Sequence, residues 1–418
     1  MSNTYEKIRN EVLAGGATDE ATDDVAGGVQ GLLGIGVIVA LLVVLAIVNI
    51  WTFVFVVGLL ICVFLHELGH FLAARRSGMK VTQFFMGMGP KLWSFKRGEI
   101  EYGVRAFPVG AFVRIVGMNN LDETPEEDED RAYRNKSYPK RMLTITAGSL
   151  MHMLIAIVLL FTVYSTWGKR ETQYDRIGVA TVEKNSAAEA AGIKSNDIIV
   201  SINGTAITAY EQVSAAIRAE KPGDKVTVVV EREGKQLSLV ATLRTNPDPA
   251  ALSKAYLGVS SGPENVFVHQ TVASAFTGSF TDLGSAAWDS VGGVLKVMNP
   301  VNIFDHLTGA NKDQTTQPVT VYGISRLSST IGKESGLAGI LLTLAGINVF
   351  IGLLNMFPLL PFDGGHAAVA TYERIRSRKG RVYRADVGKM IPVAMTVMTF
   401  LVFVMFAGLY LDITNPIK

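Results

Sequence analysis

The segment His66-Glu67-Leu68-Gly69-His70 places two imidazoles four residues apart with a carboxylate between them. On a helix, positions i and i+4 lie on one face, so both rings can bind one metal ion while Glu67 acts as general base. Zinc catalysis requires three protein ligands and an open position where water loses a proton near neutral pH. The pattern occurs by chance in many sequences. Here it ends an apolar run, where ionisable groups are costly and usually functional.

A third ligand has to come from another part of the chain. The one cysteine, Cys62, excludes a disulfide framework and a Cys-based zinc cluster. The segment NMFPLLPFDGG, which begins at Asn355, has two prolines that interrupt a helix at the membrane boundary. Asp363 is a candidate carboxylate ligand, because the two glycines after it let the backbone approach closely. Taken alone, an ordinary Pro-Gly turn that ends a span explains this segment equally well.

The composition indicates that these residues lie in a membrane protein. Apolar residues make up 49% of the 418 residues and charged residues 18%, with a mean hydropathy of +0.29. The net charge is +2 and no basic arm is present, so the sequence gives no indication of a nucleic-acid partner. Four regions have apolar runs near the roughly 20 residues of a membrane-spanning helix.

The first of these regions, 31–65, is too long for one helix across a ~30 Å hydrocarbon core. We therefore expect two spans that meet near Asn49–Thr52, the second continuing to about Ala74. A single long, tilted helix is the alternative, because no Gly or Pro marks a turn there. Two spans would place the N-terminal tail inside the cell, and one span would place it outside.

Basic residues predict the orientation. Three groups flank the apolar regions, namely Arg75 to Lys80, Lys136 to Arg141 and Arg374 to Arg384. Cytoplasmic segments are enriched in Lys and Arg, so these groups are expected inside and residues 170–335 outside. The N-terminus shows neither the basic cluster nor the cleavage site of a signal peptide.

The segment SAAEAAGIKSNDIIVSINGTAI, at 186–207, resembles a PDZ domain. The pattern predicts a strand near 178–182, a short helix that ends at Gly192, and a strand into the Asn203-Gly204 turn. A helix near 210–219 and a strand pair around Glu233-Gly234 follow. PDZ domains bind an extended chain end by strand addition to a sheet edge. A small β-rich spacer is the alternative.

Together the two metal-binding motifs resemble the site-2 protease family of intramembrane metalloproteases. Its members pair H-E-x-G-H with N-x-x-P-x-x-P-x-D-G on a later span. The segments PVTVYGISRL and LLPFDGGHAAVATYERIR look closest to actinobacterial members of the regulator-of-sigma-E protease type. The resemblance covers about residues 55–418. It implies that His66, His70 and Asp363 bind Zn²⁺, that Glu67 activates the water, and that Asn355 positions the substrate backbone or helps stabilise the oxyanion.

The resemblance also implies fold, partners and location. The expected fold is a multi-span α-helical membrane protein of the cell membrane, with an inserted extracytoplasmic PDZ domain. Its partners would be the lipid bilayer and single-span membrane proteins cleaved by regulated intramembrane proteolysis, with anti-sigma factors as one candidate class. Residues 87–117 would form a β-hairpin-like loop near the active site whose edge holds an extended substrate; an ordinary cytoplasmic hairpin is the alternative.

Two positions depart from the family pattern, Ser149 and His152. The family has A-G-P-x-x-N at the head of its second span, whereas this chain has Ala147-Gly148-Ser149-Leu150-Met151-His152. His152 either contacts the site or packs behind it. His366 is expected to be a neighbour of the site, and His269 and His306 have no partners at metal-binding spacing.

The expected segments follow from these patterns. They are an acidic polar tail at 1–30, membrane segments at 31–75, a hairpin-like loop and acidic linker at 76–142, spans at 143–167, 336–366 and 391–413, the PDZ domain at 170–250, an extracytoplasmic or interfacial linker at 251–335, and a basic cytoplasmic loop at 367–390. The acidic residues 122–130 are interpreted as solvated. An amphipathic stretch at Ala286–Val297 is either an interfacial helix or a helix packed on the PDZ domain.

Two other functions are compatible with parts of this pattern. A non-catalytic membrane receptor, or pseudoprotease, would use only the PDZ domain. A metal transporter would repeat His and Asp across several spans, whereas this chain concentrates them in two.

Overall fold

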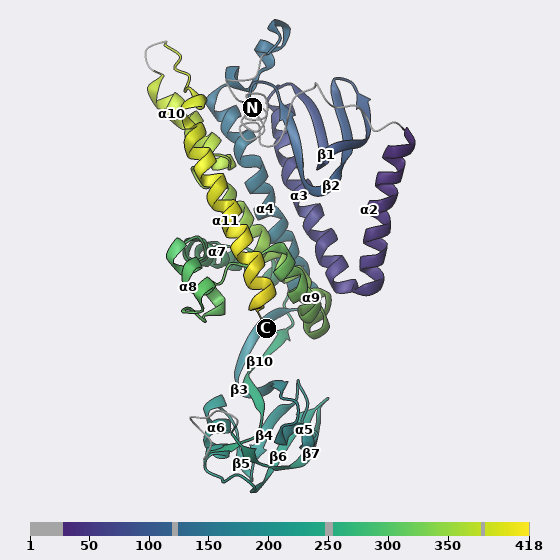
Figure 1. Ribbon diagram of the computed structural model, residues 1–418, viewed down its shortest axis with the longest axis vertical. Coiled ribbons are helices and arrows are strands. Elements are labelled where there is room, and N and C mark those ends of the chain that lie inside the picture. Colours follow the sequence, from purple (N-terminus) through teal and green to yellow (C-terminus); the bar gives the residue numbers. More distant parts are fainter. Residues whose placement is uncertain (1–27, 119–123, 247–253, 378–380, 418) are drawn as a thin grey trace. The chain divides into compact units, whose positions relative to one another are not determined.

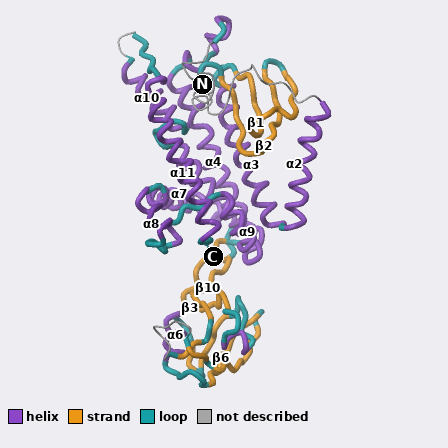
Figure 2. Tube along the Cα trace, in the orientation of Figure 1, coloured by secondary structure: helices purple, strands orange, loops and turns teal. Residues whose placement is uncertain are grey.

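The computed structural model describes residues 28–118, 124–246, 254–377 and 381–417. The chain forms two compact units, one made of residues 1–163 with 272–418 and the other of residues 164–271. Among these described residues, five helices in the first unit are long and apolar enough to cross a membrane. Most of the predicted acidic tail lies outside the described residues. Figure 1 shows the elements of both units, and Figure 2 shows that the first unit is mainly helical.

The first apolar region forms two helices, α2 (Gly28–Val48) and α3 (Ile50–Arg76). Asn49 separates them in an extended conformation, and its side chain accepts hydrogen bonds from the backbone amides of Trp51 and Thr52 at 3.1 Å. Asn is a favoured N-cap residue, so the turn needs neither Gly nor Pro. The break lies within the range where the sequence predicts two spans to meet, and a single long helix is wrong.

Helix α3 packs closely against α4 (Tyr138–Thr166) and α9 (Val321–Asn355). A Cβ atom at Gly69 of α3 would lie 2.7 Å from the carbonyl oxygen of Ala147 in α4. A Cβ atom at Gly352 of α9 would lie 2.6 Å from the Met153 side chain of α4. These glycines let the helix backbones approach closely, as small residues do in membrane helix pairs.

Helix α9 is longer than the predicted span. It begins at Val321, and Gly336 interrupts the helical backbone with φ of 59°. At its start, Asp412 of α11 (Ile391–Thr414) accepts hydrogen bonds from the backbone amides of Thr320 and Gly323. A carboxylate is favourable at a helix N-terminus. The segment 321–335, predicted as part of a linker, is therefore helical, because the Asp412 carboxylate binds backbone amides where the helix begins.

The loop after α3 forms a bent hairpin of β1 (Val81–Arg97) and β2 (Ile100–Ile115). Because of the bend, different parts of β1 and β2 pair with each other more than once. Phe84 lies opposite both Val113 and Tyr102, and Trp93 lies opposite Val104. The segments therefore run in the order 111–115, 83–86, 101–104 and 93–97, with 111–115 at one edge. Helix α3 contacts this hairpin, and Gly34 of α2 approaches the side chain of Leu92.

The acidic linker is only partly solvated. A short 3-10 helix spans Glu126–Arg131, and Asp128 within it is buried and forms an ion pair with Lys80 at 2.5 Å. The interpretation of this segment as wholly solvated is therefore wrong, because the buried Asp128 carboxylate pairs with Lys80 beside the hairpin. Residues 119–123 lie outside the described part of the chain.

The remaining helices of this unit are α7 (Val272–Val297), α8 (Pro300–Thr308) and α10 (Asp363–Arg376). Thus the segment 251–335, predicted as a linker, contains α7 and α8, and the first part of the predicted basic loop belongs to α10. Helix α7 presents large apolar side chains to the surroundings, including Phe280, Trp288 and Leu295. Phe276 of α7 packs edge-on against Phe161 of α4 at 6.2 Å.

The second unit is an antiparallel sheet with two helices. Its strands run in the order β10 (Val259–Val268), β3 (Lys169–Val182), β4 (Ile198–Ile202), β6 (Lys225–Arg232) and β7 (Lys235–Thr242), with β5 (Thr205–Ala206) beside β4. A separate pair is formed by β8 (Arg244–Thr245) and β9 (Ala255–Tyr256). Helices α5 (Ala187–Ala191) and α6 (Tyr210–Arg218) complete it.

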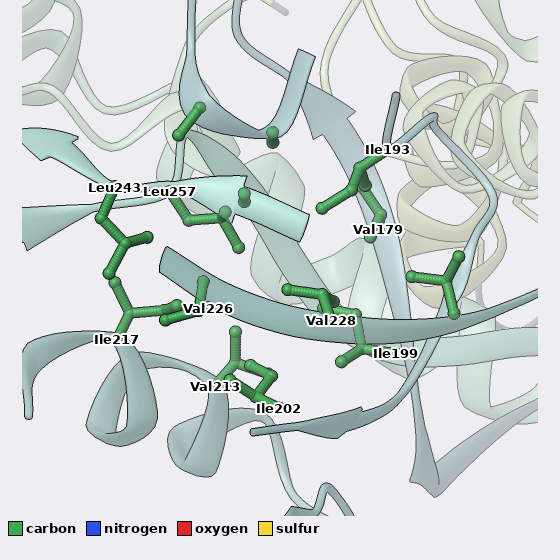
Figure 3. Close-up of a cluster of buried hydrophobic side chains, with 14 of the residues drawn as sticks. Val179, Ile193, Ile199, Ile202, Val213, Ile217, Val226, Val228, Leu243 and Leu257 are labelled. Atoms are coloured by element: carbon green, nitrogen blue, oxygen red, sulfur yellow. The ribbon is translucent and has the colours of Figure 1, made fainter. Parts of the chain in front are cut away.

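The predicted order of strands and helices between 178 and 234 is confirmed, including the end of α5 at Gly192 in the left-handed conformation. The predicted end at 250 is wrong, because β10 pairs with β3 and Leu257 lies in the core. Figure 3 shows this core, whose aliphatic side chains come from both helices and several strands. The inserted domain therefore has a core of its own.

Candidate metal centre

Helix α3 brings the two predicted imidazoles together near its C-terminal end. The Nε2 atoms of His66 and His70 lie 3.2 Å apart, and both side chains are buried. The i, i+4 spacing produces this arrangement without any contribution from the loops.

Asp363 is the first residue of α10, and it reaches the same point. Its Oδ2 atom lies 3.2 Å from Nε2 of His70 and 3.6 Å from Nε2 of His66. The preceding loop folds tightly: a Cβ atom at Gly364 would lie 2.2 Å from the carbonyl oxygen of Met356. The two glycines therefore allow the turn that aims Asp363 at the histidines. His66, His70 and Asp363 together form a cluster that can hold a metal ion.

The cluster fits zinc in both size and chemistry. Ligand atoms about 2.1 Å from a tetrahedral zinc ion lie roughly 3.4 Å from one another, and the three observed separations are 3.2, 3.2 and 3.6 Å. Oδ2 of Asp363 is buried and, among the residues that the structure describes, has no hydrogen-bond partner. Three acceptor atoms at this spacing repel one another unless a cation lies between them.

Helix α4 forms the wall behind both histidines. Nδ1 of His70 lies 2.8 Å from the backbone oxygen of Thr144, so this nitrogen carries the proton and Nε2 faces the cluster. One turn along, a Cβ atom at Gly148 would lie 2.2 Å from Nε2 of His70 and 2.4 Å from Cε1 of His66. Sequence reasoning did not identify Thr144 or Gly148 as part of the site. A glycine within an apolar span was the one available signal for Gly148.

His152 lies one further turn along α4. Its ring packs against that of His66 with 4.7 Å between centroids, and its Nδ1 lies 2.7 Å from Oδ1 of Asn348 in α9. Asn348 donates in turn to the Leu344 carbonyl and to Sγ of Cys62. His152 thus lies beside a ligand of the cluster without joining the three convergent atoms.

Glu67 lies next to the cluster and the hairpin edge. Its Oε1 is 4.0 Å from Nε2 of His66, and its side chain is 18% exposed. The backbone amide of Val113, in the edge segment 111–115, lies near the Glu67 carboxylate. The carboxylate is therefore placed between the candidate metal ligands and an open strand edge.

The other predicted residues do not belong to the cluster of three ligand atoms. Asn355 is the last residue of α9 and is half-buried, in the turn that leads to Asp363. His366 lines a small cavity with Arg141 and Glu373. His306 is buried beside the Thr316 hydroxyl at 3.1 Å, and His269 is exposed.

The hairpin beside the site contains buried charges of its own. Lys91 donates to Glu101 at 2.9 Å and Ser94 donates to the same oxygen at 2.7 Å. Burial raises the pKa of Glu101, but these hydrogen bonds outweigh it, so the pKa of this carboxyl lies below its usual range. The guanidinium of Arg105 lies over the stacked rings of Phe85 and Phe112 at about 5 Å. These contacts make the hairpin a rigid neighbour of the site.

Comparisons with known proteins agree with this geometry. Residues 54–402 match the model of Peptidase family M50. Zinc metalloprotease Rip1 of Mycobacterium bovis (strain BCG / Pasteur 1173P2) is 32% identical over 404 residues, covering 87% of this chain and 97% of that protein. Zinc metalloprotease Rip1 of Mycolicibacterium smegmatis is 31% identical over 401 residues with the same coverage.

A solved structure, the PDZ domain of the SdrC-like protein of Listeria monocytogenes, matches 22% of this chain and 92% of its own length, at 21% identity and a TM-score of 0.20. Helix α2 precedes the range matched by the family model. The resemblance read from the two motifs is confirmed by the family match and by the mycobacterial relatives. The chain belongs to peptidase family M50, the site-2 proteases, and is a multi-pass membrane metalloprotease that uses zinc.

Proposed function

We propose that this protease hydrolyses peptide bonds in the spanning segments of single-span membrane proteins, with His66, His70 and Asp363 as zinc ligands and Glu67 as general base. The observation that carries the proposal is the convergence of three acceptor atoms, two on the membrane-spanning helix α3 and one at the start of α10, with the Glu67 carboxylate beside them.

The chemistry follows from the position of each group. Zinc supplies a Lewis acid that polarises the scissile carbonyl and acidifies water. Glu67 takes the proton from the attacking water and returns it to the leaving amine. Asn355, at the turn before Asp363, is proposed to hold the substrate backbone or to donate to the developing oxyanion. Partial exclusion of water by the surrounding helices strengthens these electrostatic contributions.

A substrate helix has to become extended before its peptide bond is accessible. Among the described residues, segment 111–115 has a hairpin neighbour on one side, and strand addition on its other side would place an extended substrate next to the Glu67 carboxylate. We propose this edge as the substrate-holding surface. The four-segment order of the hairpin supports it, because 111–115 is the outermost of the four segments that the structure describes there.

The sheet domain is proposed to be an extracytoplasmic PDZ domain that excludes substrates with bulky outer domains. Between α6 and the strands β9 and β10 lies a groove lined by Val213, Ile217, Leu257 and Val259, with Arg218 and Lys254 at its rim. Strand β10 lies at the sheet edge beside this groove, which suits an extended chain end. Anti-sigma factors already trimmed outside the membrane are the proposed substrate class.

The same groove is what favours the rival function, a non-catalytic receptor that binds chain ends. Against it stands the complete set of three ligands and Glu67, which a receptor does not need.

Cleavage of a single-span test protein by the purified full-length enzyme in lipid nanodiscs separates the two functions. The proposal predicts cleavage within the spanning segment, loss of activity with a zinc chelator, and recovery when zinc is added. A zinc-loaded, folded protein that binds the trimmed test protein and leaves it intact would establish the receptor instead.

A further inference from the structure

Helix α10 is anchored at the end opposite its candidate metal ligand. Asp363 is its first residue, and Glu373 lies ten residues further along the same 14-residue helix. The Glu373 carboxylate is buried; Oε2 accepts from Arg141 of α4 at 2.7 Å, and Oε1 accepts from the Ala385 amide at 2.8 Å. One carboxylate thus joins α10, the start of α4 and the segment that leads to α11.

A second contact joins the same two helices. The hydroxyl groups of Tyr138 in α4 and Thr371 in α10 lie 3.1 Å apart. The guanidinium of Arg141 also lies over the Tyr133 ring at 4.8 Å, which limits the positions that this side chain can take. The start of α4 and the end of α10 are therefore held in one register.

The same face of α4 holds the histidines. Arg141, Thr144 and Gly148 follow one another at spacings of three and four residues, so they lie on one side of the helix. Thr144 bonds His70, and Gly148 lies against both imidazoles. Helix α4 therefore contacts α3, which carries two candidate ligands, and α10, which carries the third.

We infer that the Arg141–Glu373 ion pair is a positioning device for Asp363. It fixes the rotation and the axial position of α10 against the helix that holds His66 and His70. A metal site tolerates ligand displacements of only about 0.2 Å, and residues that orient ligands typically change metal affinity 10–100-fold when they are replaced. Neither Arg141 nor Glu373 belongs to the ligand cluster, so they act through Asp363.

Zinc affinity of the full-length protein, measured by chelator competition, tests the inference. Arg141→Met should weaken zinc binding about tenfold, while Arg141→Lys, which keeps a cation opposite Glu373, should stay within about threefold of wild type. Lys80→Met is the matched control, because it breaks a different part-buried ion pair, the one with Asp128 in the 3-10 helix Glu126–Arg131. Equal weakening in Lys80→Met and Arg141→Met would overturn the inference in favour of general destabilisation.

A double-mutant cycle isolates the route through Asp363, because coupled residues give non-additive effects. With Asp363→Ala, zinc should be held weakly by the histidine pair alone, and adding Arg141→Met should change that affinity less than twofold. An undiminished tenfold loss in that background would overturn the inference. The inference rests on the proposed ligand set, and the failures are distinguishable. If Asp363→Ala alone leaves the affinity intact, the ligand set is wrong. If Asp363→Ala weakens zinc and Arg141→Met does not, the positioning role is wrong.

Discussion

The Nδ1 atom of His70 donates a hydrogen bond to the backbone carbonyl of Thr144, with 2.8 Å between nitrogen and oxygen. The acceptor is a main-chain atom, so the bond is maintained by the distance between α3 and α4 and not by the side chain at position 144. That distance depends on Gly69 and Gly148, where a side chain would collide with the facing helix or with the imidazoles. The orientation of a zinc ligand is thereby set by helix packing.

Gly148→Ala should therefore weaken zinc binding while the protein stays folded. A methyl group there would lie 2.2 Å from Nε2 of His70, which forces the ring or the helix to move. Zinc affinity should fall at least tenfold, by analogy with changes to groups that orient ligands. Gly346→Ala is the control, because nothing lies within 4 Å of a Cβ atom at that position in α9. Unchanged zinc content in Gly148→Ala would refute the assigned role of α4.

Replacing residues 169–268 by a flexible linker should leave cleavage of a short single-span substrate largely intact, because the ligand cluster lies wholly in the other unit. Substrates with folded outer domains, which the wild type excludes, should now be cut. Matched substrates with and without such a domain provide the measurement. If the shortened protein binds zinc and no longer cuts the short substrate, the sheet domain recruits substrates and does not filter them.

Helix α7 should lie in the membrane interface. Its exposed Trp288 and Leu295 form an apolar face next to a polar one, and Phe276 continues the apolar surface of the spanning helix α4. The fluorescence of Trp288 is obtained as the difference between wild type and Trp288→Phe. In nanodiscs that contain brominated lipids, this fluorescence should be quenched by the lipid. If iodide in the water quenches the Trp288 fluorescence and the brominated lipid does not, helix α7 lies outside the membrane interface.

The ion pair between Asp197 and Arg232 should stabilise the sheet domain in a pH-dependent way. The Asp197 side chain is almost fully buried and bonds Arg232 through both oxygens, at 2.6 and 2.7 Å. Burial raises the pKa of Asp197, but the bonds from Arg232 outweigh it, so this carboxyl has a pKa below its usual range. Its stabilisation is present above the ordinary carboxyl pKa of about 3.9 and is lost as the pH falls through the lowered value.

Asp197→Asn should accordingly lower the free energy of unfolding of this domain by about 3 kcal/mol at pH 7. The difference from wild type should persist down to about pH 4 and shrink below it. Pulse proteolysis of the full-length protein across this range measures the difference. A difference that stays constant down to pH 2 would show that the bonds do not depend on the charge of the carboxylate.

The ligand set could be predicted because each part leaves a local pattern. The spacing of His66 and His70 is the spacing of one helical turn, and the prolines and glycines around Asp363 mark an interrupted helix. The structure brings these residues together, and their roles in metal binding and catalysis remain predictions. The element order of the sheet domain could also be read locally, from turns such as Asn203-Gly204.

The parts that could not be predicted depend on contacts between distant segments. Residues 321–335 contain Ser, Gly and Lys and look like a linker, yet they form helix because Asp412, about 90 residues away, binds the first amides. The double pairing of Phe84 follows from a bend in the hairpin, and glycines such as Gly87 and Gly89 mark a break there without indicating which segments pair. The Thr144 carbonyl has no side-chain signature at all. In each case the partner lies far along the chain and the interaction uses main-chain groups.

The central claim is that Glu67 acts as the base beside a zinc ion held by three other side chains. Glu67→Gln tests it most directly, with zinc content and cleavage of a single-span substrate measured on the same purified protein. The account predicts about one zinc per chain, as in wild type, together with cleavage reduced at least 100-fold, because the amide cannot accept the proton. Wild-type cleavage by Glu67→Gln, or loss of zinc along with activity, would contradict this assignment.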